Sequence, residues 1–144
     1  MESRNATGSQ AGQQRPLQLK LHLSQNSSRN SFTAYGRGYV TVNGVRYERS
    51  LVVLPDRVVT DWNVPTLESL TQDSIAALVG LKPELVLLGT GELLRFPDSR
   101  LLATLMAERI GAEVMDTRAA CRTYNILAEE GRNVAAALII PPTA

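Results

Sequence analysis

The sequence has very little of the residue types that most often carry chemistry. It contains one cysteine and one histidine among 144 residues, so an intrachain disulfide is excluded and a zinc site of the Cys/His kind is not expected. We therefore expect no metal and no cofactor. Basic and acidic side chains are nearly balanced, 15 against 14. A general nucleic-acid binder needs a basic stripe, so nucleic acid is not a predicted partner.

Long apolar runs are missing too. No stretch approaches the roughly 20 apolar residues that span a bilayer, so no transmembrane segment is predicted. Residues 1–14 are rich in Ser, Gly, Gln and Asn, a composition that cannot offset its ordering entropy and lacks the apolar core of a secretory signal. We expect a disordered tail over residues 1–16, one α/β domain over residues 17–144, and a bacterial cytoplasmic protein.

The first half of the chain has β-strand patterns. Leucines alternate with polar residues over residues 17–23, which is typical of a half-buried strand. The pair Asn43-Gly44 separates two strand-like runs and is a strong hairpin signal. The predicted strands cover residues 17–23, 35–42, 45–53 and 58–60, with a turn at Pro55-Asp56 between the last two.

The second half alternates helix and strand. A short helix is predicted over residues 73–79, a buried strand over 85–88, and a helix capped by Asp98 or Ser99 and stopped by Gly111. The apolar stripe of the capped helix consists of Leu101, Leu102, Leu105, Met106 and Ile110.

A strand over residues 112–115 follows. The last helix starts at Asp116 or Thr117 and ends at Gly131, and residues 134–140 form the last strand. This order implies parallel strands joined by right-handed crossovers.

Gly89-Thr90-Gly91 follows the first buried strand and offers two interpretations. Paired glycines let backbone N–H groups approach a phosphate. However, Leu94 stands where a dinucleotide fingerprint has its third glycine, and a Walker lysine is absent. We therefore favour a tight turn over a nucleotide site.

The last helix carries the remaining candidates for chemistry. Cys121 lies on its apolar stripe with Ala120, Tyr124, Leu127 and Ala128, which favours an inert buried thiol over a nucleophile. The distant His22 lies on the polar side of its strand pattern and is a poor base.

A second stripe of this helix is polar and consists of Arg118, Arg122, Asn125 and Glu129. This stripe is either a solvent-exposed helix face or a patch that binds a carboxylate, a phosphate or a partner chain. Asp116 is interpreted as a cap. Trp62 is interpreted as a core anchor, with an interface role as the alternative.

Several segments together resemble a known family. They are residues 32–36, 43–44, 50–55, 87–91, 115–117, 120–127 and 130–132, which include Gly89-Thr90-Gly91 and Ala-Cys-Arg-Thr-Tyr-Asn. The chain resembles an uncharacterised single-domain α/β family of archaeal and bacterial proteins that includes a mitochondrial assembly factor for respiratory complex I and an adipogenesis-associated cytosolic relative. The resemblance implies a three-layer α/β fold with a mixed central sheet and a small additional β layer, and no established enzyme activity.

Two functional hypotheses follow. The first is a non-catalytic binding or assembly protein, acting on a protein partner in respiratory or membrane-complex assembly. The second is a protein that binds a small molecule or an anion in a crevice outside the strand ends. Under this second hypothesis, an enzymatic function stays an open alternative. A deep pocket with converging polar groups would favour the second, and a flat apolar-rimmed patch the first.

Both hypotheses place the site where the glycine turn meets the start of the last helix, because parallel strands put their carboxyl ends on one edge. The candidate binding residues are Gly89, Thr90, Gly91, Asp116, Thr117, Arg118, Arg122 and Thr123. No catalytic residue is predicted. The sequence does not decide between a monomer and a homo-oligomer.

Overall fold

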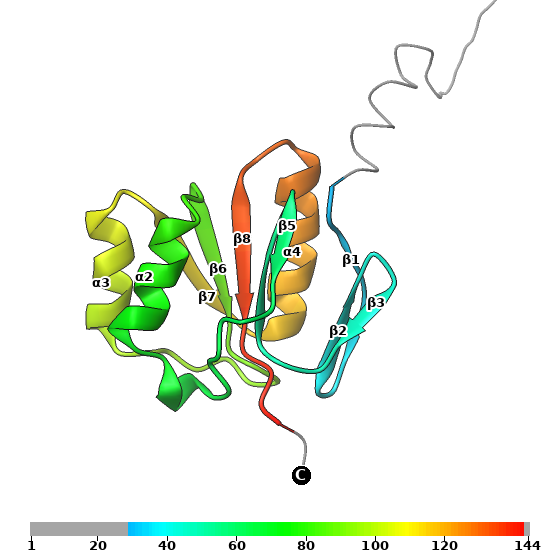
Figure 1. Ribbon diagram of the computed structural model, residues 1–144, viewed down its shortest axis with the longest axis horizontal. Helices are drawn as coiled ribbons and strands as arrows, with labels where there is room; N and C mark the ends of the chain where they lie inside the picture. The colour runs from blue at the N-terminus through cyan, green and yellow to red at the C-terminus, as the bar shows by residue number, and fades with distance from the viewer. Residues whose placement is uncertain (1–28, 143–144) are drawn as a thin grey trace, which may run out of the picture.

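The computed structural model describes residues 29–142. The protein has three layers, and a five-stranded sheet forms the middle one (Figure 1). Two helices cover one face of this sheet, and one helix together with a small sheet covers the other. The predicted three-layer α/β architecture with a mixed sheet and an extra β layer is confirmed. The predicted tail, the leucine-alternating strand at residues 17–23 and His22 lie outside the described residues.

The small sheet contains strands β1 (Phe32–Gly36), β2 (Tyr39–Val42) and β3 (Val45–Tyr47), in that order and antiparallel. Asn43 and Gly44 have φ angles of 52° and 83°, the left-handed pair that a tight hairpin turn requires. The predicted strand over residues 35–42 was wrong, because a turn with Gly38 at φ 78° divides it between β1 and β2.

The central sheet has the order β5-β4-β8-β6-β7. Strands β6 (Leu85–Gly89), β7 (Gly111–Met115) and β8 (Val134–Leu138) are parallel, with β6 between the other two. Strand β4 (Leu51–Leu54) runs antiparallel to β8 and to β5 (Arg57–Val59). The predicted strand over residues 45–53 is therefore also wrong, since its halves β3 and β4 belong to different sheets.

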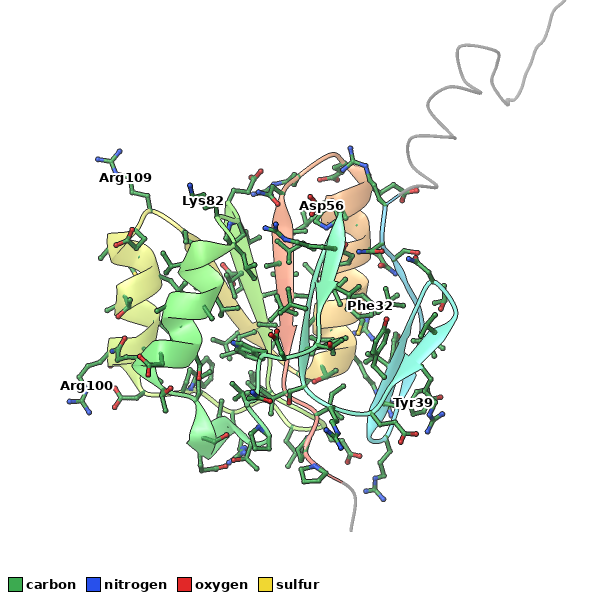
Figure 2. The ribbon with its side chains drawn as sticks, viewed as in Figure 1. Phe32, Tyr39, Asp56, Lys82, Arg100 and Arg109 are labelled. Atoms are coloured by element: carbon green, nitrogen blue, oxygen red, sulfur yellow. The ribbon has the colours of Figure 1, made fainter. Side chains whose placement is uncertain are left out.

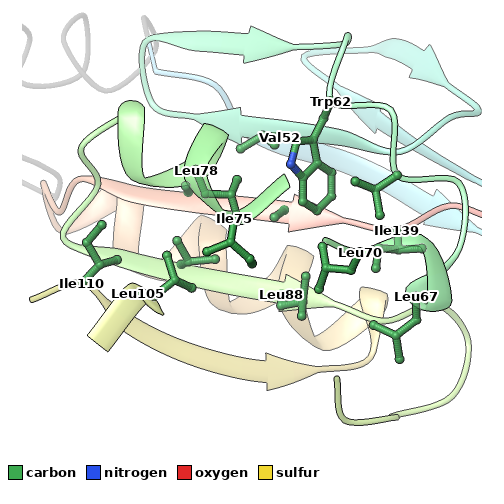
Figure 3. Packing of buried hydrophobic residues seen from close by; sticks show 14 of the residues in the cluster. Val52, Trp62, Leu67, Leu70, Ile75, Leu78, Leu88, Leu105, Ile110 and Ile139 are labelled. Atoms are coloured by element: carbon green, nitrogen blue, oxygen red, sulfur yellow. The ribbon is translucent and has the colours of Figure 1, made fainter. Parts of the chain in front are cut away.

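Helices α2 (Gln72–Gly80) and α3 (Ser99–Ala107) cover one face of the sheet, after a short 3₁₀ helix, η1 (Leu67–Ser69). Figure 3 shows the core between them, where Ile75, Leu78 and Leu105 face Val52 and Leu88 of the sheet. Trp62 is buried in this core and its indole N–H donates to the carbonyl of Ser74 at 3.1 Å. The interpretation of Trp62 as a core anchor is confirmed.

Two predictions about α3 were wrong. Met106 was placed on the apolar stripe, but it is 69% exposed, whereas its neighbour Leu105 is buried, so the buried side of the helix does not include position 106. Gly111 was expected to stop the helix, but it is the first residue of β7. Arg109, at φ 61°, takes the left-handed conformation instead, as polar residues at helix ends occasionally do.

Helix α4 (Thr117–Glu129) covers the other face and joins it to the small sheet. The Phe32 and Tyr124 rings meet edge to face with centroids 5.2 Å apart. Asn125 accepts from the backbone N–H of Phe32 and donates to its carbonyl, both at 2.8 Å. Asn125 therefore fastens β1 to α4 and is not part of a free polar face. Within the described chain, no helix has the length and apolar character to span a membrane.

Candidate functional site

The glycine turn lies directly beside the start of α4, as predicted. Gly89 is the last residue of β6. The Gly91 N–H donates to the Thr117 hydroxyl and the Thr117 N–H donates back to the Gly91 carbonyl, both at 2.9 Å. The Thr90 N–H donates to the carbonyl of Met115 at 2.9 Å. The turn and the helix start therefore form one hydrogen-bonded unit.

The polar groups of this unit already have partners within the protein. The buried Thr90 hydroxyl donates to the Leu93 carbonyl at 2.8 Å and accepts from the Arg95 N–H at 3.1 Å. The Asp116 carboxylate caps α4 by accepting from the Ala119 N–H at 2.9 Å, as the cap interpretation expected. A phosphate cradle needs unpaired N–H groups and no carboxylate at the helix start. The geometry therefore favours the tight turn.

Gly89 has a packing reason to be glycine. A methyl group there would lie 2.7 Å from Leu138 Cδ2 and 3.2 Å from Thr117 Cα. The helix can approach the strand closely only because no side chain intervenes, and Gly91, at φ 104°, then turns the chain. The two glycines thus serve the helix–strand contact.

The cationic candidates lie on the outer side of α4. Arg118 is exposed and close enough to Glu92 to help lower the pKa of that carboxyl, although the main cause is the hydrogen bond from Arg37. Arg122 is exposed and donates to the Tyr35 hydroxyl at 3.2 Å. Thr123 is half-buried on the same helix but does not line the groove described next.

An open groove of about 550 Å³ connects the glycine turn to the small sheet. Its walls are the β1–β2 turn, the segment after β6, the first turn of α4 and the residues that follow β8. Thr90 and Gly91 belong to the wall after β6 and Thr117 belongs to the wall of α4, so the candidate residues line two of these four walls. Across the groove mouth, Arg37 and Glu92 pair at 2.7 Å, and both side chains are largely exposed. The glycine turn is therefore one side of a larger open surface and not the floor of a closed cavity.

Sequence reasoning missed the opposite wall and the rim of this groove. Tyr35 and Tyr39 come from strands of the small sheet and Arg37 from the turn between them, and no sequence spacing links these residues to residues 89–91. The rim is a segment between β6 and α3, where Leu93 is 74% exposed and Phe96 71% exposed. Two leucines and a phenylalanine outside any periodic pattern were the signal that could have identified this rim.

The exposed rim is held by an ion pair. Arg95 Nη1 lies 2.6 Å from Glu68 Oε2, and this contact lowers the pKa of Glu68 and raises that of Arg95. A second open groove of about 620 Å³ lies on the Glu68 side of Phe96. The segment 92–97 therefore lies between two grooves, and it exposes Leu93, Leu94 and Phe96 beside the paired Glu92 and Arg95.

Cys121 is fully buried. Burial raises the pKa of its thiol to about 12, against a smaller opposing effect of Arg122, so the reactive thiolate is scarce at neutral pH. This supports the interpretation of Cys121 as a structural residue. Among the residues that the structure describes, no group of three or more His, Cys, Asp or Glu side chains is placed to hold a metal ion.

The layers and the mixed sheet place this chain in a class of protein, the α/β domains of the Mth938-like type. A solution structure from Bordetella pertussis, described as a Mth938-like domain, has a TM-score of 0.71 and 30% identity, and covers 91% of this chain and 92% of that chain. The chain belongs to the family described as "Protein of unknown function (DUF498/DUF598)", which matches residues 32–139. The family resemblance predicted from the sequence is confirmed.

Two further relatives are informative. A crystal structure from Bordetella parapertussis has a TM-score of 0.74 and 39% identity, and covers 78% of this chain and 97% of that chain. The Bos taurus protein "NADH dehydrogenase [ubiquinone] 1 alpha subcomplex assembly factor 3" is 37% identical over 131 residues, which is 90% of this chain. The chain spans 66% of the length of that assembly factor.

Proposed function

We propose that this chain is a non-catalytic binding protein that helps to assemble a respiratory or other membrane complex. The observation that carries the proposal is the group of exposed apolar side chains in segment 92–97, between two open grooves, where Leu93 and Phe96 are each more than two-thirds exposed. Large apolar side chains gathered on a surface mark sites of protein interaction. The name of the bovine assembly factor gives independent support.

At the glycine turn, the groove lacks the free polar groups of a small-molecule site. Such sites are concave and present a few convergent polar groups, whereas the hydroxyl of Thr90 and the N–H of Gly91 are bonded within the protein. The alternative, an anion held at the glycine turn by Arg118 or Arg122, stays a prediction. A cytoplasmic location is also part of the proposal, and the lone cysteine is in keeping with a reducing compartment.

Site-specific crosslinking tests the proposal. A photo-reactive amino acid replaces Leu93 or Phe96 in the full chain, and the control replaces Met106, which is 69% exposed on α3. We expect adducts from positions 93 and 96 that contain a subunit of a membrane complex, identified by mass spectrometry. The same adducts from all three positions, or none from positions 93 and 96, would contradict the proposal.

A further inference from the structure

We propose that the groove between the β1–β2 turn and the glycine turn binds an extended acidic segment of the partner protein, with apolar side chains beside a carboxylate. This inference rests on the proposed function and specifies the chemistry of the partner. The groove lining contains three arginines, Arg37, Arg95 and Arg118, against one acidic side chain, Glu92. Its formal charge is therefore positive, which complements an acidic occupant.

Arg118 is the cation best placed for the partner's carboxylate. Arg37 is paired with Glu92 at 2.7 Å and Arg95 with Glu68 at 2.6 Å. Within residues 29–142, Arg118 is exposed and makes no ion pair. Guanidinium groups bind carboxylates through two parallel hydrogen bonds, and an unpaired guanidinium can do so without first losing a protein partner.

The apolar residues of the groove lining offer a contact surface for the apolar side chains of the bound segment. The half-buried rings of Tyr35 and Tyr39 lie on one wall, and Leu93 and Pro141 lie on others. Tyrosine rings give large contact area with little loss of side-chain freedom. An extended chain places successive side chains on opposite sides, so one set can contact this surface while a carboxylate reaches Arg118.

Charge argues against two other occupants. Residues 1–28 of this chain contain Arg4, Arg15 and Lys20 against Glu2 alone, so this segment would meet like charge in the groove. An anionic membrane surface attracts clustered unpaired basic residues, whereas the arginines at positions 37 and 95 are already paired.

A peptide selection tests this inference. The full chain is used to select from a phage library of random ten-residue peptides, and the affinities of the enriched peptides are measured by fluorescence anisotropy. We expect enriched peptides to combine acidic and apolar residues, and Arg118→Glu to weaken their binding at least tenfold. The substitution should not disturb folding, because Arg118 is exposed and acidic residues are favourable in the first turn of a helix.

The matched control is Arg109→Glu, which makes the same charge change far from the groove. Figure 2 shows Arg109 and Tyr39 at opposite corners of the molecule. We expect Arg109→Glu to bind the peptides within twofold of the unchanged chain. Equal weakening by both variants, enriched peptides without acidic residues, or no enrichment would overturn the inference.

Two further measurements exclude the other occupants. A dimer seen by light scattering that Leu93→Ser dissociates would make a second copy the occupant, and sedimentation with phosphatidylglycerol vesicles that Arg118→Glu abolishes would make a membrane the occupant. Either result overturns the inference. If the crosslinks at positions 93 and 96 appear while peptide binding ignores Arg118→Glu, the proposed function stands and this inference fails. If the crosslinks are absent, the proposed function fails.

Discussion

At the scale of single residues, the glycine turn is shaped by packing. A Cβ atom at Gly89 would meet Leu138 and the backbone of Thr117 at 2.7 and 3.2 Å. We expect Gly89→Ala to lower the free energy of unfolding by about 1–3 kcal/mol, the usual cost of overpacking. Chemical denaturation measures the change.

Gly80→Ala is the control for this substitution. A Cβ atom at Gly80, the last residue of α2, meets nothing within 4 Å. The control is expected to be neutral or to stabilise by up to about 1 kcal/mol, because alanine has the higher helix propensity. Equal effects of the two substitutions would mean that helix α4 can shift away from β6 at no cost.

Cys121 provides a second test at this scale. Because burial raises the pKa of the thiol to about 12, we expect native protein to react slowly with a thiol reagent at neutral pH, and denatured protein to react fast. The raised pKa also means that this thiol favours folding below its ordinary pKa of 9.0 and that its contribution is lost as the pH rises toward 12. Fast labelling of native protein would revive Cys121 as a nucleophile.

At the scale of elements, the helix starts depend on single capping side chains. Asp116 caps α4 through the Ala119 N–H, and α4 joins the central sheet to the small sheet. We expect Asp116→Ala to destabilise the protein by about 1 kcal/mol, the typical value of a lost cap. Thermal unfolding measures it.

The control for the cap is Asp61→Ala, because Asp61 is exposed and caps no helix in the described chain. Its melting temperature should stay close to that of the unchanged protein. If Asp116→Ala also leaves the melting temperature unchanged, the hydrogen bonds of Thr117 to Gly91 hold the helix start without a cap.

The elements that sequence patterns predicted well are those with local signals. Helix α4 was recognised from its apolar stripe and from Gly131, which has a φ of 89°. Strand β6 was recognised as a short apolar run. The run at residues 45–53 was misjudged, because two consecutive strands that belong to different sheets both look like extended chain, and local patterns do not report which partner a strand pairs with.

At the scale of the whole molecule, we expect the N-terminal tail to contribute nothing to folding. Residues 1–14 have almost no apolar side chains, so they cannot offset their ordering entropy. Deleting them should leave the melting temperature unchanged in scanning calorimetry. A drop of several degrees, equivalent to roughly 1 kcal/mol, would contradict this prediction.

Only part of the candidate site could be predicted from the sequence. The meeting of the glycine turn and the start of α4 was predicted, because parallel strands place their carboxyl ends on one edge. The opposite wall of the groove, with Tyr35 and Tyr39, was not predicted, because it comes from a sheet about fifty residues earlier in the chain. Contacts between segments so far apart leave no periodic trace.

The sequence by itself determined the class of fold, the parallel unit of β6, β7 and β8, the N-terminal caps of α3 and α4, the turn at Asn43-Gly44, and the family, because each of these depends on local patterns or on recognisable motifs. Tertiary structure alone decided which strands share a sheet, which polar groups are already bonded, and where the groove lies. The physical reason is that hydrogen-bond satisfaction and concave surfaces arise from the packing of distant segments. The Gly91 N–H, available to a ligand by its sequence context, is in fact bonded to Thr117.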